Sequence, residues 1–450
     1  MNLDRRAFLA RAAATAAFAS TPGAAFSQVV GGGSGFSDYR ALVCVFLFGG
    51  NDSFNMLVPR STAEYNVYAN ARQNLSVAQD VLLPINPLAS DGVDYGLHPS
   101  MPGLQTLFES GAATFVANVG PLIEPTTKDQ FLNQAVLLPP QLFSHNDQQD
   151  QWQSLKGQAL TATGWAGRMA DIIRDGVSNQ QMATNASLFG TNLLQSADDT
   201  VAYVMGPGGP LQFEGFSTTP GSFEFQQREA FLRVLRAQYG SIYERAFVDV
   251  QQRAIEEADT ITAAISTAPP LTTAFPDSQL GQQLNTVARL IAVRERLSMQ
   301  RQIFFVATGG FDSHDNQNED QPALLGGVSE ALKAFYDATV ELGVSREVTS
   351  FTQSDFGRTL TSNGDGTDHA WGGNQIVVGD SVLGRQIIGQ YPLLQIDGAD
   401  DVGGGRIIPT LSADQYAATL ARWFGIAESD IGAVAPHLAN FSQTDLGFIA

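Results

Sequence analysis

Short apolar segments recur along the chain and are separated by segments with helical periodicity. The apolar segments are rich in β-branched or aromatic residues, and most end at glycine or asparagine, which is typical of buried strands. They lie at residues 41–48, 113–119, 303–308, 348–353 and 375–378. Apolar residues with helical spacing lie between them, at residues 102–110, 284–300 and 322–342. This alternation predicts an α/β fold with a mostly parallel sheet flanked by helices.

The remaining segments are predicted to extend this one domain. Residues 187–278 combine Gly-Pro turns with a polar helical stretch at 226–265, which predicts a helical insertion or cap over the edge of the sheet. Residues 412–425 have the pattern of a capped amphipathic helix that packs on the core. We therefore expect residues 38–450 to form a single α/β domain with an insertion at about 187–278.

The N-terminus has the form of a twin-arginine export signal. Arg5 and Arg6 precede an Ala-rich apolar run at residues 12–19, which is shorter than the roughly 20 residues that span a bilayer. The alternative is a buried Ala-rich helix that begins with two arginines. We expect residues 1–27 to be a signal peptide read by the twin-arginine translocase and residues 28–37 to be a flexible, Gly-rich lead-in. The mature protein is then periplasmic or secreted.

Composition narrows the possible partners. The formal net charge is −20, and removing residues 1–27 takes away three arginines and one aspartate, so the mature chain carries −20 − 2 = −22. Such a charge repels nucleic acid, so we expect no nucleic-acid partner. No second apolar stretch is long enough for a membrane span.

Cys44 is the only cysteine, which excludes an intramolecular disulfide. Its apolar neighbours in sequence predict a buried side chain.

Polar residues follow three of the predicted strands directly. Asp52 follows the first strand, Asp312 and His314 follow the strand at 303–308, and Asp355 follows the next strand along the chain. Because the carboxyl ends of parallel strands meet at one edge of a sheet, we expect these side chains to share a crevice. Each of these groups alone is equally typical of an ordinary helix N-cap.

Three of the five histidines lie within two residues of an aspartate. These are His145, His314 and His369. Histidine nitrogens and aspartate oxygens are ligands of divalent Zn, Mn, Fe, Mg or Ca, so the pattern predicts a divalent metal site of unknown identity. The alternative is that exposed turns simply favour Asp, Asn and Gly. His98, which precedes Pro99, has no adjacent acid and is predicted to be structural.

Taken together, several motifs in this order resemble a bacterial family known as the domain-of-unknown-function 1501 family. That family consists mainly of twin-arginine-exported proteins related to the alkaline phosphatase and sulfatase superfamily. The resemblance covers nearly the whole chain. It runs through the Arg-Arg signal, Leu47-Phe48-Gly49-Gly50-Asn51-Asp52, Gly96-Leu97-His98-Pro99-Ser100, Ser144-His145, Gly309-Gly310-Phe311-Asp312-Ser313-His314, Asp355-Phe356-Gly357-Arg358-Thr359 and Asp368-His369-Ala370-Trp371-Gly372.

The resemblance implies an alkaline-phosphatase-like fold and a metal-dependent hydrolase of phosphate- or sulfate-type esters, with a small molecule or glycan as substrate. It implies Ser144 as the nucleophile, supported by His145, and Arg358 as a clamp for a phosphate or sulfate oxygen. An arginine at that position is as often solvated or salt-bridged. The metal ligands that it implies are Asp52, Asp312, His314, Asp355 and His369.

Two departures from the superfamily pattern keep other functions open. One residue separates Asp312 from His314 where the superfamily often has three, and Phe356 follows Asp355 where it has histidine. At least one ligand is therefore missing or has moved, with His145 or Asp368 as the alternative replacement. The main alternative is a non-catalytic, exported binding or assembly protein that kept the fold, with or without a structural metal. A lyase or transferase on the same metal site would have the same sequence pattern.

Overall fold

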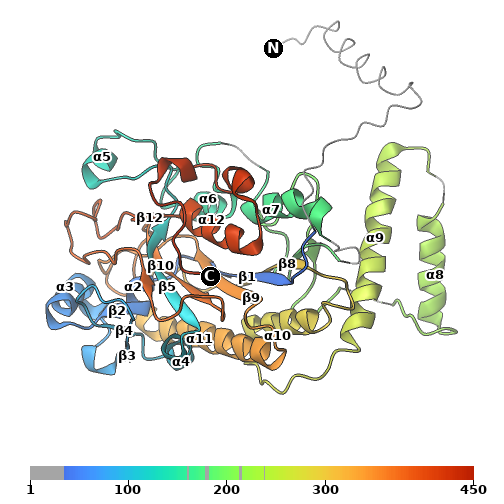
Figure 1. Cartoon of the computed structure of the whole chain (residues 1–450), viewed down its shortest axis with the longest axis horizontal. Coiled ribbons are helices and arrows are strands. Elements are labelled where there is room, and N and C mark those ends of the chain that lie inside the picture. Colours follow the sequence, from blue (N-terminus) through green and yellow to red (C-terminus); the bar gives the residue numbers. More distant parts are fainter. Residues whose placement is uncertain (1–34, 160–161, 178–181, 212–214, 238) are drawn as a thin grey trace, which may run out of the picture. The chain divides into compact units, whose positions relative to one another are not determined.

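The predicted strands form the middle of one large sheet (Figure 1). The computed structural model describes residues 35–159, 162–177, 182–211, 215–237 and 239–450. Within these ranges the sheet has nine strands. In order across the sheet they are β11 (Ile387–Ile388), β5 (Ala113–Gly120), β10 (Gly373–Val378), β9 (Val348–Ser354), β1 (Arg40–Leu47), β8 (Arg301–Thr308), β6 (Asn185–Ser187) and β7 (Tyr203–Val204), with β12 (Leu411–Ser412) beside β5.

The central strand β1 sets the direction of its neighbours. It pairs in parallel with β8 on one side and with β9 on the other, while β10 is antiparallel to both β9 and β5. The prediction of a mostly parallel sheet is therefore confirmed. Leu47 lies opposite Thr308 and Ser354, so β1, β8 and β9 end at the same edge. The polar segments that follow these strands must leave the sheet side by side.

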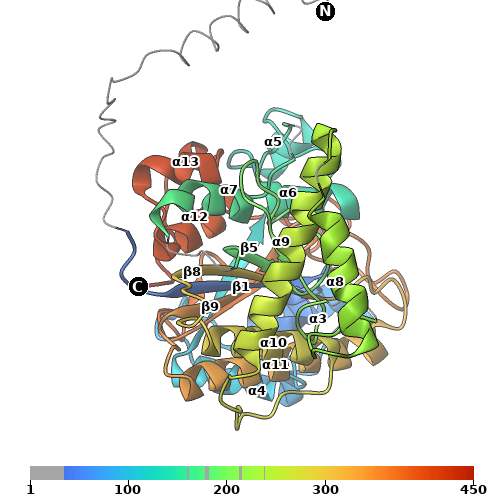
Figure 2. The ribbon, with the colours of Figure 1, turned by 90° about the vertical axis from the view of Figure 1, so that its right-hand side faces the viewer.

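Helices cover both faces of the sheet, as Figures 1 and 2 show. One face packs against α4 (Pro102–Ser110), α10 (Gln279–Ala292) and α11 (Gln317–Glu341), and the other against α6 (His145–Ser154), α7 (Trp165–Ile173) and α12 (Ala413–Phe424). Side chains of β1 alternate between the two faces. Val43 and Val45 pack in the core on the face of α4, α10 and α11, and Cys44 and Phe46 pack in the core on the opposite face. The predicted burial of Cys44 is confirmed.

The remaining helices and a small second sheet lie around this body. The second sheet has the order β2 (Leu57–Pro59), β4 (Tyr95–Leu97), β3 (Leu83–Ile85). The other α-helices are α2 (Ser53–Met56), α3 (Thr62–Arg72), α5 (Lys128–Leu132), α8 (Phe223–Leu235), α9 (Ile242–Ile265) and α13 (Ile431–Val434). Among the described helices, none combines the length and apolarity needed to cross a membrane.

Two predicted helix boundaries were wrong, and the reason is that polar residues hide the helix starts. Helix α10 begins at Gln279, after the capping hydroxyl of Ser278, and ends at Ala292 rather than near residue 300. Helix α11 begins at Gln317, before Pro322. Its first turns carry buried glutamines instead of apolar residues, so hydrophobic periodicity does not reveal them. Helix α12 begins, as predicted, with a capping box at Ser412.

Helices α8 and α9 lie within the stretch at 187–278 that was predicted to be an insertion, and they pack against each other through Leu232, Leu235 and Ile255. Figure 2 shows them side by side in front of the sheet.

Residues 36–450 form one compact unit. The predicted signal peptide and most of the lead-in lie outside the described residues, so export stays a prediction.

Gly49 fixes how closely the segments after β1 and β8 approach. Its φ is +114°, and a Cβ there would lie 2.3 Å from the backbone nitrogen of Asp312. We expect Gly49→Ala to lower the free energy of unfolding by about 3 kcal/mol or more, because a backbone clash adds to the strain of a positive φ. Gly92→Ala is the control, since Gly92 has φ +94° with open space around it, and should cost only about 1 kcal/mol. Equal losses in urea denaturation would contradict the close approach.

Candidate functional site

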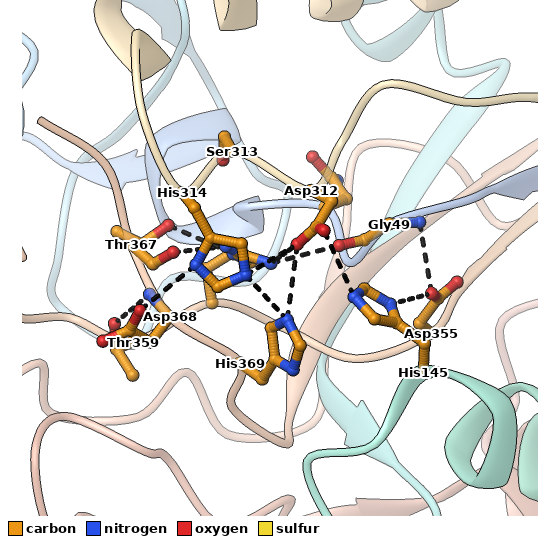
Figure 3. A network of polar contacts seen from close by, with 12 residues as sticks. Gly49, His145, Asp312, Ser313, His314, Asp355, Thr359, Thr367, Asp368 and His369 are labelled. Atoms are coloured by element: carbon orange, nitrogen blue, oxygen red, sulfur yellow. Dashed lines mark hydrogen bonds and ion pairs between the residues drawn. The ribbon is translucent and has the colours of Figure 1, made fainter.

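The carboxyl ends of β1, β8 and β9 meet the start of helix α6 and the loop before β10 at one polar site (Figure 3). Asp312 lies at its centre. Its Oδ2 is 3.4 Å from Nε2 of His145, and its Oδ1 is 3.1 Å from Nε2 of His314 and 3.3 Å from Nε2 of His369. We call these four residues the histidine–carboxylate cluster. Ligand atoms of His145, Asp312 and His369 lie within 4.8 Å of one another, as a metal ion would require.

Each imidazole of the cluster has its second nitrogen against an oxygen atom. Nδ1 of His145 is 2.7 Å from Oδ2 of Asp355, Nδ1 of His314 is 3.2 Å from Oδ1 of Asp368, and Nδ1 of His369 is 2.8 Å from the carbonyl oxygen of Phe143. An oxygen acceptor places the ring proton on Nδ1 and leaves the Nε2 lone pair free. Metal-binding histidines are held in the same way.

The Nε2 atoms of His314 and His369 are only 2.9 Å apart. With both ring protons on Nδ1, two lone pairs face each other and also face the carboxylate of Asp312. Such an arrangement requires a proton or a cation between the nitrogens. Burial lowers the pKa of His369, which favours the neutral, ligating form of its ring.

Asp312 is held as an anion. Burial by itself raises the pKa of Asp312, but the hydrogen bond and charge of Arg358, together with His145 and His314, hold it below its ordinary value. Nη1 of Arg358 lies 2.7 Å from Oδ1 of Asp312. The side chain of Asp312 is 45% exposed, so the anion is accessible from solution.

Arg358 lies beneath the cluster and not at its open side. Its side chain has no exposed surface, and it donates to Asp312, to the carbonyl oxygen of Gly49, and to both the hydroxyl and the carbonyl oxygen of Thr367. Most of its donors are therefore used within the protein. The sequence predicted an oxyanion clamp, whereas the structure places this guanidinium as the support of Asp312.

Asp355 stands behind His145 in the structure. It is fully buried, and its Oδ2 accepts hydrogen bonds from His145, from Nε2 of Gln149 at 2.9 Å and from the backbone nitrogen of Gly49 at 3.2 Å. Burial raises its pKa, against the effect of these hydrogen bonds. The geometry therefore gives Asp355 an orienting role toward His145, where the sequence predicted a metal ligand.

Asp52 belongs to a buried network next to the cluster. Its Oδ2 accepts from the guanidinium of Arg72 and from the side-chain amide of Gln317. Asp52 and Arg72 are at most 1% exposed, so they form a buried ion pair. Gln317 accepts from the hydroxyl of Thr367, which also accepts from Arg358. The structure thus connects Asp52 to the cluster only through other side chains.

Ser144 lies at the N-cap position of α6, directly before His145. Its hydroxyl donates to Oδ2 of Asp147 at 2.6 Å and not to a member of the cluster. Of the residues predicted for the site, the structure thus brings together Asp312, His314, His369 and His145, with Asp355 and Arg358 supporting them. Asp52 and Ser144 have other hydrogen-bond partners.

Several supporting groups were missed by the sequence analysis. The carbonyl of Phe143 has no sequence signal, because any residue has a carbonyl and only its position matters. Phe143 has a φ of 72°, an unusual backbone conformation for a bulky residue. Arg72 lies on helix α3, outside the motifs, and Gln317 lies at the start of α11, three residues after His314, where a glutamine carries no signal of its own. Asp368 was noticed only as a replacement ligand, and the structure places it behind His314.

The fold and the cluster together define an α/β protein with a histidine–carboxylate site at the carboxyl edge of its sheet. The chain belongs to the family of proteins of unknown function called DUF1501, whose family model matches residues 39–405. This confirms the family resemblance drawn from the motifs within that range, whereas the Arg-Arg signal lies outside the matched residues and stays a prediction. A comparison with curated proteins found no match.

Three proteins are among the solved structures with some similarity to this chain. Ps i-CgsB, solved in complex with k-i-k-neocarrahexaose, is 9% identical, with 89% of this chain and 72% of that chain covered and a TM-score of 0.33. A protein from Bacteroides thetaiotaomicron, described in connection with the metabolism of multiple glycosaminoglycans, is 11% identical, with 87% and 74% covered and a TM-score of 0.33. The PsFucS1 sulfatase from Pseudoalteromonas sp. is 8% identical, with 87% and 68% covered and a TM-score of 0.33. Similarity this weak carries no argument about activity, which must come from the site.

The buried ion pair supports the site, so removing one partner should be costly. We expect Arg72→Met to lower the free energy of unfolding by about 3–5 kcal/mol, because it leaves Asp52 buried without a counterion. Adding Asp52→Asn to this variant should restore part of the loss. Arg174→Met is the control, since Arg174 and its partner Asp175 are exposed and such pairs contribute little. No recovery in the double variant, measured by urea denaturation, would contradict the pairing.

His98 gives a pH dependence of stability. It is 6% exposed, and burial lowers its pKa to about 4. The unfolded chain takes up a proton on this ring near pH 6.5, which the folded chain takes up only near pH 4. Folding stability must therefore fall as the pH drops from about 6.5 to 4. We expect His98→Gln to lose less stability than the wild type between pH 7 and 4.5 in urea denaturation. An equal loss in both proteins would show that the ring does not titrate this way.

Proposed function

We propose that this protein is a metal-dependent hydrolase of phosphate- or sulfate-type esters, and that the histidine–carboxylate cluster holds its metal. The observation that carries the proposal is the convergence of three imidazole Nε2 atoms on the carboxylate of Asp312, with two of them 2.9 Å apart. Imidazole nitrogens together with a carboxylate match Zn, Mn or Fe better than Mg or Ca, which prefer oxygen ligands. A bound divalent ion would supply Lewis acidity and lower the pKa of a coordinated water molecule.

The residues around the cluster have separate tasks in this proposal. Asp355, Asp368 and the carbonyl oxygen of Phe143 orient the three rings through Nδ1. Arg358 keeps Asp312 ionised and in place. The cluster is partly exposed, with side-chain exposures of 24–45%, so an ester can approach it from solution.

Ser144 is the proposed nucleophile. It precedes His145 at the start of α6, and its hydroxyl donates a 2.6 Å hydrogen bond to Oδ2 of Asp147. A carboxylate in that position can act as the base that activates the hydroxyl. The substrate class follows from the order of the motifs that resemble the alkaline phosphatase and sulfatase superfamily. A small molecule or a glycan ester, met in the periplasm or outside the cell, fits the predicted export signal.

A non-catalytic protein with a structural metal is the second candidate. Two observations favour it: the hydroxyl of Ser144 is bonded to Asp147 and not to the cluster, and the Arg358 guanidinium is buried. Both functions predict a metal ion, and only the first predicts turnover.

Metal analysis of purified protein tests the proposal. We expect one divalent ion per chain, and Asp355→Asn should weaken its binding by about 10- to 100-fold, because the variant keeps the ligands and loses the hydrogen-bonding carboxylate behind His145. His369→Ala, which removes a ligand, should weaken it further. His437→Ala is the control, since that histidine lies outside the cluster. The readouts are metal content, metal affinity and hydrolysis of a panel of phosphate and sulfate monoesters.

The outcomes separate the two functions. Absence of a stoichiometric metal ion, or wild-type affinity in His369→Ala, would overturn the metal site. Stoichiometric metal with no hydrolysis of any ester, and no effect of Ser144→Ala on anything but stability, would favour the structural role. Hydrolysis that is lost on chelation and in Ser144→Ala would support the proposed mechanism.

A further inference from the structure

Two arginines are hydrogen-bonded to members of the cluster in the described part of the chain, and they differ in what they can still bind. Arg358 supports Asp312 from below and is fully buried. Arg406 donates from Nε to the carbonyl oxygen of His369 at 3.3 Å and is only half-buried. The residue that the sequence predicted as the oxyanion clamp is therefore buried, while a second, half-buried arginine contacts the backbone of His369.

The position of Arg406 is fixed from three sides. Its Nη1 donates to the carbonyl oxygen of Gly403 at 3.0 Å, and its guanidinium carbon lies 5.1 Å from the centre of the Phe143 ring. Phe143 is the residue whose carbonyl holds His369. The loop that carries Arg406 is itself tied down, because the buried carboxylate of Asp401 accepts from the backbone nitrogens of Gly403 and Gly405.

This anchoring leaves one end of the guanidinium available. Nε and Nη1 are used, whereas Nη2 makes no hydrogen bond to any described residue. A guanidinium held by stacking and two hydrogen bonds loses little freedom when it binds an anion. It also offsets a strongly acidic setting, since Asp312, Asp355 and Asp368 surround the histidines and the whole chain carries a net charge of −20.

We infer that Arg406 binds the tetrahedral oxyanion of the substrate beside the cluster, in the role that the sequence suggested for Arg358. The inference rests on the proposed function, because an anion is drawn there by the cluster's cation as well as by the guanidinium. A phosphate and a sulfate ester share this chemistry. Arg406 is thus a specificity residue for anionic esters and not a metal ligand.

Titration calorimetry of metal-loaded protein with inorganic phosphate, and separately with inorganic sulfate, tests the inference. We expect Arg406→Gln to weaken binding of the preferred anion by at least about tenfold, and Arg406→Lys to retain part of the affinity. Phe143→Leu keeps the carbonyl that holds His369 but removes the stacking ring, and should weaken anion binding less than Arg406→Gln does. Metal content should stay at the wild-type value in all three variants.

Arg296→Gln is the matched control, because it removes the same charge from an exposed side chain near the opposite end of β8. It should bind the anion as the wild type does. Comparing phosphate with sulfate shows which anion the site prefers. Metal-loaded wild type that binds neither anion, or Arg406→Gln that binds as tightly as the wild type, would overturn the inference. Failure of the wild type to bind metal would overturn the proposed function, and the inference with it.

Discussion

The hydrogen bond from Arg358 to Asp312 ties a partly exposed site to the interior of the domain. Arg358 also bonds to Gly49 and Thr367, so the segments after β1, β8 and β9 are joined by one side chain. Thr367 continues the connection through Gln317 to the ion pair of Asp52. Without this support Asp312 would be a mobile surface carboxylate, and the three histidines would have no fixed centre.

This arrangement places charge where burial is costly. Arg72, Arg358, Asp52 and Asp355 have almost no exposed surface. Such groups are tolerated only when they are paired and hydrogen-bonded. Here the hydrogen bonds connect the buried ion pair of Asp52 to Asp312 in the cluster. The network is therefore better explained by the positioning of the site than by stability, since replacing a buried ion pair with apolar residues of similar volume is often neutral or stabilising.

The sequence predicts the fold well and the site in part, for separate physical reasons. Strands such as β1 and β8 are buried on both faces of the sheet. Their sequences are therefore continuous apolar runs, which can be recognised without the structure. Asp312, His314 and His369 could be grouped because strand ends converge and because these residue types bind metals. The pairing of Asp52 with Arg72 could not be foreseen, since helix α3 shows no motif and a sequence contains no distances.

The absence of distances from a sequence also explains why the roles of Arg358 and Arg406 could not be predicted from it. Arg358 lies within a motif and next to the site in sequence, and only burial shows that its donors are used inside the protein. Arg406 lies far from the histidines in sequence, in a glycine-rich loop whose shape depends on Asp401. Motif order predicts which residues approach a site, whereas side-chain direction is decided by packing that the motif does not encode.

The cluster is better suited to a metal cation than to protons. A proton on one Nε2 satisfies that nitrogen and one neighbour, but three imidazoles and a carboxylate present more acceptors than a single proton can bridge. The proposed divalent ion would accept lone pairs from several directions, and ligand atoms of His145, Asp312 and His369 lie within 4.8 Å of one another. Burial also lowers the pKa of His369, so protons compete poorly for its ring at neutral pH. The Nδ1 partners of the three rings hold them with their Nε2 atoms turned toward Asp312, which is the arrangement that the proposed metal site needs.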